Sequence, residues 1–118
     1  MRFMMLYKPG RESDAPPSSQ EMAAVGQLIQ EMMSAGVLIA TEGLQPSSKG
    51  ARVRISGSEF VVTDGPFAET KDLIGGYAIV QVKSKQEAVE WSKRFLKAVG
   101  VGESEIRLMH EQPAGAKH

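Results

Sequence analysis

Two stretches of the chain, residues 3–41 and 76–110, follow the same plan. Each runs from an apolar strand-like segment through a Ser-x-x-Glu sequence to an apolar stripe at helical spacing, a glycine and a second strand-like segment. A serine followed three residues later by glutamate is typical of a helix N-terminus, and a glycine after the stripe is typical of its C-terminus. The plan therefore predicts two strand–helix–strand units whose helices each have one apolar side.

The first predicted helix begins at Ser18 and stops at Gly36, and the second begins at Ser84 and stops at Gly100. Apolar side chains recur at helical spacing in both. They are Met22, Val25, Ile29, Met32 and Met33 in the first helix, and Ala88, Trp91, Phe95 and Val99 in the second.

A hairpin is predicted between the two units. Residues 51–55 alternate arginine with apolar residues, a Ser-Gly-Ser turn follows, and residues 59–63 return as a second strand. We interpret Arg52 and Arg54 as its solvent face. The whole order predicts an α+β fold of the ferredoxin-like split βαβ type with an inserted β-hairpin. Its antiparallel sheet should carry both helices on one face, because crossovers between parallel strands are right-handed.

The predicted central strands, residues 3–7 and 77–82, have apolar side chains at successive positions, so both faces of the sheet are apolar. Two helices on one side leave the other face uncovered, and soluble monomers seldom keep so large an apolar patch. The sequence therefore predicts a homodimer, sheet against sheet, that encloses a partly hydrophobic interior.

Composition limits the classes of partner. The 118 residues fit one domain, expected over residues 1–112, with residues 113–118 as a flexible tail. Lys plus Arg and Asp plus Glu number 14 each, so the zero net charge favours neither nucleic acid nor a membrane surface. Without cysteine or an apolar leader, we expect a cytoplasmic protein with no disulfide. No metal site or cofactor is predicted, because the two histidines form no ligand motif.

The greatest density of chemical groups is in residues 64–71, Asp-Gly-Pro-Phe-Ala-Glu-Thr-Lys, followed closely by Gly75-Gly76-Tyr77. Loops at strand ends are where functional sites collect. In one interpretation Asp64 or Glu69 moves a proton, while Lys71 or Tyr77 stabilises an enolate-like oxygen. In the other, residues 64–66 are a turn, Glu69 and Lys71 are a solvated ion pair, and Tyr77 is a core aromatic. The predicted binding residues are Phe67, Thr70, Lys71 and Tyr77.

The run of residues 62–71, followed by Gly75-Gly76-Tyr77, resembles the signature of the YCII-related proteins, and within them the branch named DGPF after residues 64–67. Further matches cover nearly the whole chain. They are residues 35–38, 42–46, 87–91 and 106–107. The resemblance implies a ferredoxin-like dimeric α+β barrel.

The resemblance also implies two kinds of activity. The wider group carries a proposed His-Asp pair and includes a dehydrochlorinase acting on a chlorinated hydroxyquinol. Asp64 matches the acid, whereas the first strand–helix half of this chain has no histidine. Members of the DGPF branch often lie near extracytoplasmic-function sigma factors, which implies a regulatory association.

Two hypotheses follow. The first is a cofactor-independent enzyme of lyase or isomerase type that acts on a small organic molecule between the sheet and the Asp64 loop. The second is a non-catalytic module that binds a ligand or a protein and is associated with transcription regulation. Charged groups beside an apolar cavity favour the first.

Overall fold

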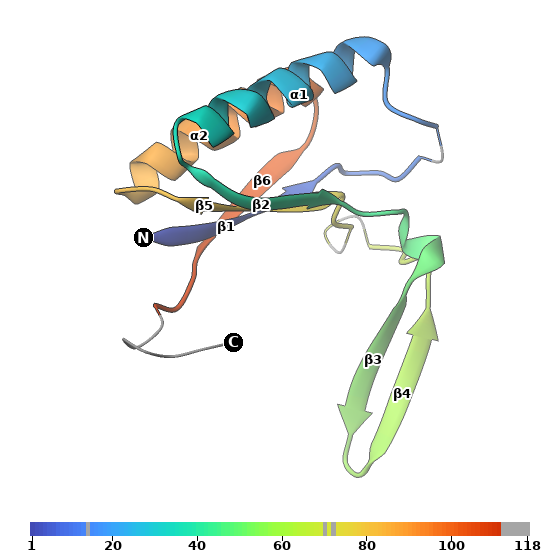
Figure 1. Ribbon diagram of the computed structural model, residues 1–118. Helices are drawn as coiled ribbons and strands as arrows, with labels where there is room; N and C mark the ends of the chain where they lie inside the picture. The colour runs from blue at the N-terminus through green and yellow to red at the C-terminus, as the bar shows by residue number, and fades with distance from the viewer. Residues whose placement is uncertain (14, 70, 72, 112–118) are drawn as a thin grey trace.

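The computed structural model describes residues 1–13, 15–69, 71 and 73–111 (Figure 1). Its elements are β1 (Arg2–Lys8), α1 (Ser19–Ser34), β2 (Leu38–Gly43), the 3-10 helix η1 (Ser47–Lys49), β3 (Ala51–Ser56), β4 (Glu59–Asp64), β5 (Gly76–Gln81), α2 (Lys85–Val99) and β6 (Glu103–Leu108). This is the predicted order. The last strand, for which the sequence predicts residues 105–110, begins two residues earlier, and the predicted tail lies outside the described residues.

Four strands form one antiparallel sheet in the order β2-β5-β1-β6. The strand β5 lies between β1 and β2, and β1 lies between β5 and β6. Each helix therefore crosses over one strand of the sheet. Figure 1 shows α1 and α2 on the same side of this sheet. The predicted ferredoxin-like α+β fold is thereby confirmed.

Both helices begin at the predicted serines. The Ser18 and Ser84 hydroxyls accept hydrogen bonds from the backbone N–H groups of Glu21 and Glu87 at 3.0 and 3.2 Å. Each capping hydroxyl satisfies one donor that the helix itself cannot pair. Gly100 ends α2 in the left-handed conformation (φ 82°), which glycine adopts without steric cost.

The core lies between the sheet and the helices. Its buried members are Phe3, Met5, Leu28, Met32, Val37, Val80, Val82 and Ala88. Two members of the predicted stripe are wrong. Met22 is 60% and Met33 63% exposed, whereas Leu28, outside the predicted stripe, is buried in α1 one turn before Met32.

The other face of the sheet is apolar at its centre. Register places Met4 opposite Ile79 and Leu6 opposite Tyr77 on this face, and all four side chains are partly buried. At one flank, the Lys8 ammonium lies 2.8 Å and the Arg107 guanidinium 3.1 Å from the Glu105 carboxylate. Neither helix covers this surface, which we call the open face (Figure 1).

The hairpin formed by β3 and β4 is a separate two-stranded sheet. Figure 1 shows it extending past the main sheet on the side away from the helices. Every residue of both strands is exposed. The alternation of residues 51–55 predicted one covered and one solvent face, whereas in the single chain both faces are in solvent.

Candidate functional site

Residues 64–71 lie at the base of the hairpin, where hydrogen bonds fasten it. The Gly65 N–H donates to the Gly50 carbonyl at 3.0 Å, and the Phe67 N–H donates to the Ser47 hydroxyl oxygen at 3.0 Å. Ser47 in turn donates its backbone N–H and its hydroxyl to the Glu12 carboxylate at 2.6 and 2.7 Å. A chain of bonds thus joins the loop before α1 to the Asp-Gly-Pro-Phe turn.

Gly65 is required there by close approach of the backbone. A Cβ atom at this position would lie 1.7 Å from the Ser47 carbonyl oxygen. The peptide between Gly65 and Pro66 is cis. The close approach of the Gly65 backbone to Ser47 gives this part of the motif a structural function.

The candidate side chains of the same loop point into solvent or onto the hairpin. Asp64, Glu69 and Lys71 are exposed. The partly buried ring of Phe67 lies under the Arg52 guanidinium, with 3.9 Å from its carbon to the ring centroid, a cation–π contact. Thr70 lies outside the described residues. Among the described residues no hydrogen bond or ion pair joins the Asp64 or Glu69 side chain to that of Tyr77, so their chemical roles stay predictions.

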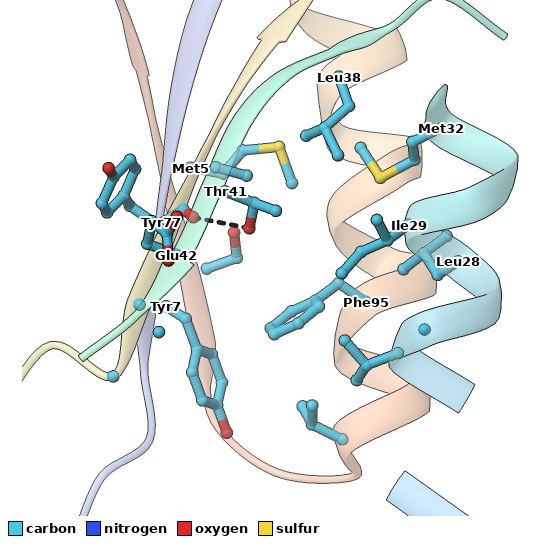
Figure 2. Close-up of a pocket in the computed structure, with 18 of the residues that line it drawn as sticks. Met5, Tyr7, Leu28, Ile29, Met32, Leu38, Thr41, Glu42, Tyr77 and Phe95 are labelled. Carbon is cyan, nitrogen blue, oxygen red and sulfur yellow. Dashed lines mark hydrogen bonds between the residues drawn. The ribbon is translucent and has the colours of Figure 1, made fainter. Parts of the chain in front are cut away.

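A pocket of about 500 Å³ lies on the other side of the sheet, beneath α1. Figure 2 shows Met5, Leu38 and Thr41 pointing from the strands toward Ile29 and Met32 of α1 and Phe95 of α2. The Tyr77 ring lies on the opposite side of the strands, on the open face, so only its backbone borders the pocket. The lining is predominantly apolar, which is typical of small-molecule sites.

Small residues leave this space unfilled. Gly26 of α1 and Ala78 of β5 both line it. A Cβ atom at Gly26 would meet nothing within 4 Å, so a larger side chain at this position has room. By contrast, a Cβ atom at Gly76 would lie 2.9 Å from the Glu42 carbonyl, so β2 and β5 pack too closely there for a side chain.

Two hydroxyl groups at the pocket have committed their protons to carbonyl groups of the chain. A third, that of Ser104, lies 3.1 Å from the Ser92 hydroxyl, and either of these two can be the donor. The Tyr7 hydroxyl donates to the Val101 carbonyl at 2.7 Å, and the Thr41 hydroxyl donates to the Tyr77 carbonyl at 2.9 Å. Burial raises the pKa of Tyr7, and the negative charge of Glu21 raises it further, so the phenol keeps its proton. Both oxygens retain lone pairs, so toward a ligand they act as acceptors.

Glu21 also lines the pocket. Glu87, its counterpart in α2, accepts a hydrogen bond from the Lys83 N–H at 2.8 Å. Among the described residues the Glu21 carboxylate has no such partner, so it is available to a ligand. The sequence analysis missed this role because the Ser-x-x-Glu spacing accounted for Glu21 as part of a helix cap. For Tyr7 and Thr41, no local sequence pattern indicates a place at a binding site.

A model of the YCII-related domain family matches residues 1–108. The chain belongs to the YCII-related family. An uncharacterized protein of Rhizobium meliloti (strain 1021) is 33% identical over 79 residues. That match covers 66% of this chain and 64% of the relative, so the chain spans slightly less than two thirds of its length. The predicted YCII-related membership is confirmed.

A solved structure of similar outline is 5-chloro-2-hydroxyhydroquinone dehydrochlorinase from Burkholderia phenoliruptrix, in complex with 2,5-dihydroxybenzoquinone. The identity is 14%, the TM-score is 0.47, and the match covers 95% of this chain and 96% of that one. At this level of similarity we assign no function to this YCII-related chain from that enzyme.

Two further properties concern the described residues alone. They contain no group of three or more histidine, aspartate or glutamate side chains placed to hold a metal ion. Neither α1 nor α2 has the length and hydropathy that a membrane-spanning helix requires.

Proposed function

We propose that this YCII-related protein binds a small, largely apolar organic molecule carrying a hydrogen-bond donor, in the pocket beneath α1. The observation that carries the proposal is the pocket itself, about 500 Å³ and lined mainly by apolar side chains. That volume falls within the range of roughly 300–1,000 Å³ that is usual for ligand sites.

The polar groups of the lining are mainly hydrogen-bond acceptors, so they favour a ligand that carries a hydrogen-bond donor. Tyr7 and Thr41 have committed their protons, and Glu21 is an acceptor when ionised. The nearby backbone donor of Gly75 is also used, at 2.7 Å from the Tyr7 carbonyl oxygen. A buried acceptor without a donor is costly, so a ligand with a hydroxyl or amine group is favoured.

The charge of the lining disfavours anions. It contains the Glu21 carboxylate and, among the described residues, no lysine, arginine or histidine. Glu42 pairs with Tyr77 and so directs its side chain to the open face, with only its backbone at the pocket. A carboxylate brought into a mostly apolar pocket would lose hydration and meet like charge. Neutral phenols, alcohols and amines are therefore the expected class.

A panel of three naphthalene compounds tests this proposal by isothermal titration calorimetry. 2-Naphthol supplies a donor, naphthalene supplies none, and 2-naphthoate supplies an anion on the same frame. We expect 2-naphthol to bind about 10-fold or more tightly than either of the others, since a hydrogen bond to a charged group contributes roughly 1.5–3 kcal/mol. Glu21→Gln should remove most of that preference.

Two leucine variants locate the binding. Gly26→Leu places a side chain in the pocket and should abolish binding, while Gln30→Leu adds the same group at an exposed position of α1 and should not. Equal affinity for naphthol and naphthoate, or undiminished binding by Gly26→Leu, would contradict the proposal.

A proton-transfer reaction of lyase or isomerase type is the second candidate. What favours it is the Glu21 carboxylate, which lines the pocket and has no side-chain partner among the described residues. The motif Asp64-Gly65-Pro66-Phe67 supports placement in the DGPF branch, and Asp64 and Glu69 are the acids that we propose from the sequence. Asp64→Asn and Glu69→Gln extend the same titration. If both retain full binding and any turnover found for the wild type, the acidic loop has no part in the site.

The alternative of a non-catalytic module tied to transcription regulation predicts a protein partner. Its support is the β3–β4 hairpin, every residue of which is exposed in the single chain. Ligand binding beneath α1 is compatible with either alternative, because the hairpin strands contribute no residue to the pocket.

A further inference from the structure

A pair of serine hydroxyl groups lies beside the pocket. Ser104 of β6 lines the pocket, and its hydroxyl oxygen is 3.1 Å from that of Ser92 in α2. Ser92 is buried, only 4% exposed, whereas Ser104 is partly buried. A serine hydroxyl carries one proton and two lone pairs. The pair therefore holds two protons and uses only one of them in the bond between the two oxygens.

Burial decides which serine donates in this bond. If Ser104 donated, the Ser92 proton would have no acceptor, because in the described part of the chain Ser104 is the only hydrogen-bond partner of Ser92. A buried donor without an acceptor is costly. If Ser92 donates instead, its proton is satisfied, and the remaining proton is that of Ser104. The pair therefore favours a Ser104 hydroxyl whose proton is available to the pocket.

This proton distinguishes Ser104 from the other hydroxyl groups of the lining. Tyr7 and Thr41 donate to carbonyl groups of the chain at 2.7 and 2.9 Å, so neither has a proton left for a ligand. The Tyr77 side chain lies on the open face. Among the described lining residues, Ser104 is thus the side chain that can donate a hydrogen bond to a ligand.

The donor and the carboxylate lie toward the same end of the pocket. Register places Ser104 opposite Tyr7 on the neighbouring strand, so the two side chains share a face of the sheet. Glu21 is close enough to Tyr7 for its negative charge to raise the pKa of the phenol. Figure 2 shows Tyr7 at one end of the pocket and Leu38 and Met32 at the other. The pocket therefore has a polar end, with one donor and one acceptor, and an apolar end.

We propose that Ser104 selects a hydroxyl group on the ligand. The Ser104 proton goes to the ligand oxygen, while the ligand's own hydroxyl proton goes to the Glu21 carboxylate. A hydroxyl group donates and accepts at the same atom, whereas an aromatic N–H group only donates. Ser92 is then a positioning residue that fixes the direction of the Ser104 proton. This inference rests on the proposed ligand site and narrows its ligands from alcohols, phenols and amines to alcohols and phenols.

Two aromatic ligands test the role of Ser104 by isothermal titration calorimetry. 2-Naphthol donates and accepts, whereas indole donates but has no accepting lone pair. Ser104→Ala should weaken the binding of 2-naphthol by about 5- to 10-fold, the effect of one hydrogen bond, and change that of indole by less than about 2-fold. Ser92→Ala leaves the Ser104 hydroxyl in place and should weaken 2-naphthol less than Ser104→Ala does. Ser56→Ala, at an exposed position of the hairpin, is the matched control and should change neither affinity.

The outcomes separate this inference from the proposed function. An unchanged affinity of Ser104→Ala for 2-naphthol, or an equal loss for 2-naphthol and indole, overturns the role of Ser104 alone. If the wild type binds neither compound, or if Gly26→Leu binds both as the wild type does, the ligand site itself is contradicted. Thermal unfolding checks that each variant folds. If Ser104→Ala does not fold, Ser104→Cys makes the same comparison, because a thiol of similar size is a weak donor.

Discussion

Gly65 shows how a single residue controls the hairpin. A Cβ atom there would lie 1.7 Å from the Ser47 carbonyl, whereas one at Gly50 would lie 3.7 Å from the same atom. Gly65→Ala should lower the free energy of unfolding by about 1–3 kcal/mol, because the backbone has to shift. Gly50→Ala, at ordinary contact distance, is the control and should change it by roughly 0.5 kcal/mol or less. Chemical denaturation measures both, and equal losses would contradict the close approach.

Glu105, on the open face, should make the stability of the fold depend on pH. Hydrogen bonds from Lys8 and then Arg107 hold the pKa of its carboxyl below the ordinary value. A carboxyl with a lowered folded-state pKa stabilises the fold above its unfolded value, and this contribution is lost as the pH falls through the folded value. Glu105→Gln should therefore lower the melting temperature at pH 7 but not at pH 3. An equal loss at both pH values would show that charge is not the cause.

At the scale of elements, the helices could be predicted because their signals are local. A serine hydroxyl caps the backbone three residues ahead, and a glycine at the end takes the left-handed conformation, so the chain carries both boundaries. The hairpin strands could be predicted as well, from the alternation of arginine with apolar residues. Their surroundings could not, because what covers an amphipathic hairpin depends on a surface distant in sequence or in another chain.

The candidate site was harder to predict for the same reason. Tyr7, Glu21 and Thr41 come from β1, α1 and β2, and each has an ordinary local explanation as a strand end, a cap or a strand residue. The fold brings these three residues to one pocket, and no spacing in the sequence predicts that they meet. Residues 64–71 were predicted as the site because their chemical groups are dense. In the structure, the backbone N–H groups of Gly65 and Phe67 instead hold the base of the hairpin by hydrogen bonds.

At the scale of the whole molecule, the two sides of the sheet have different functions in this account. The side beneath the helices holds the pocket in which we propose a small molecule, and the open face is the side on which the sequence predicts a second copy. The hypothesis based on sequence alone placed ligand and partner on the same side. Methionine side chains separate these possibilities, because Met5, Met22 and Met32 line the pocket while Met4 lies on the open face.

Methyl NMR of the methionines, recorded while 2-naphthol is added, is therefore the most direct measurement. We expect the Met5, Met22 and Met32 signals to shift together with saturation, while those of Met4 and of the exposed Met33 stay in place. Shifts confined to Met4, with the pocket methionines unmoved, would place the ligand on the open face and contradict the account.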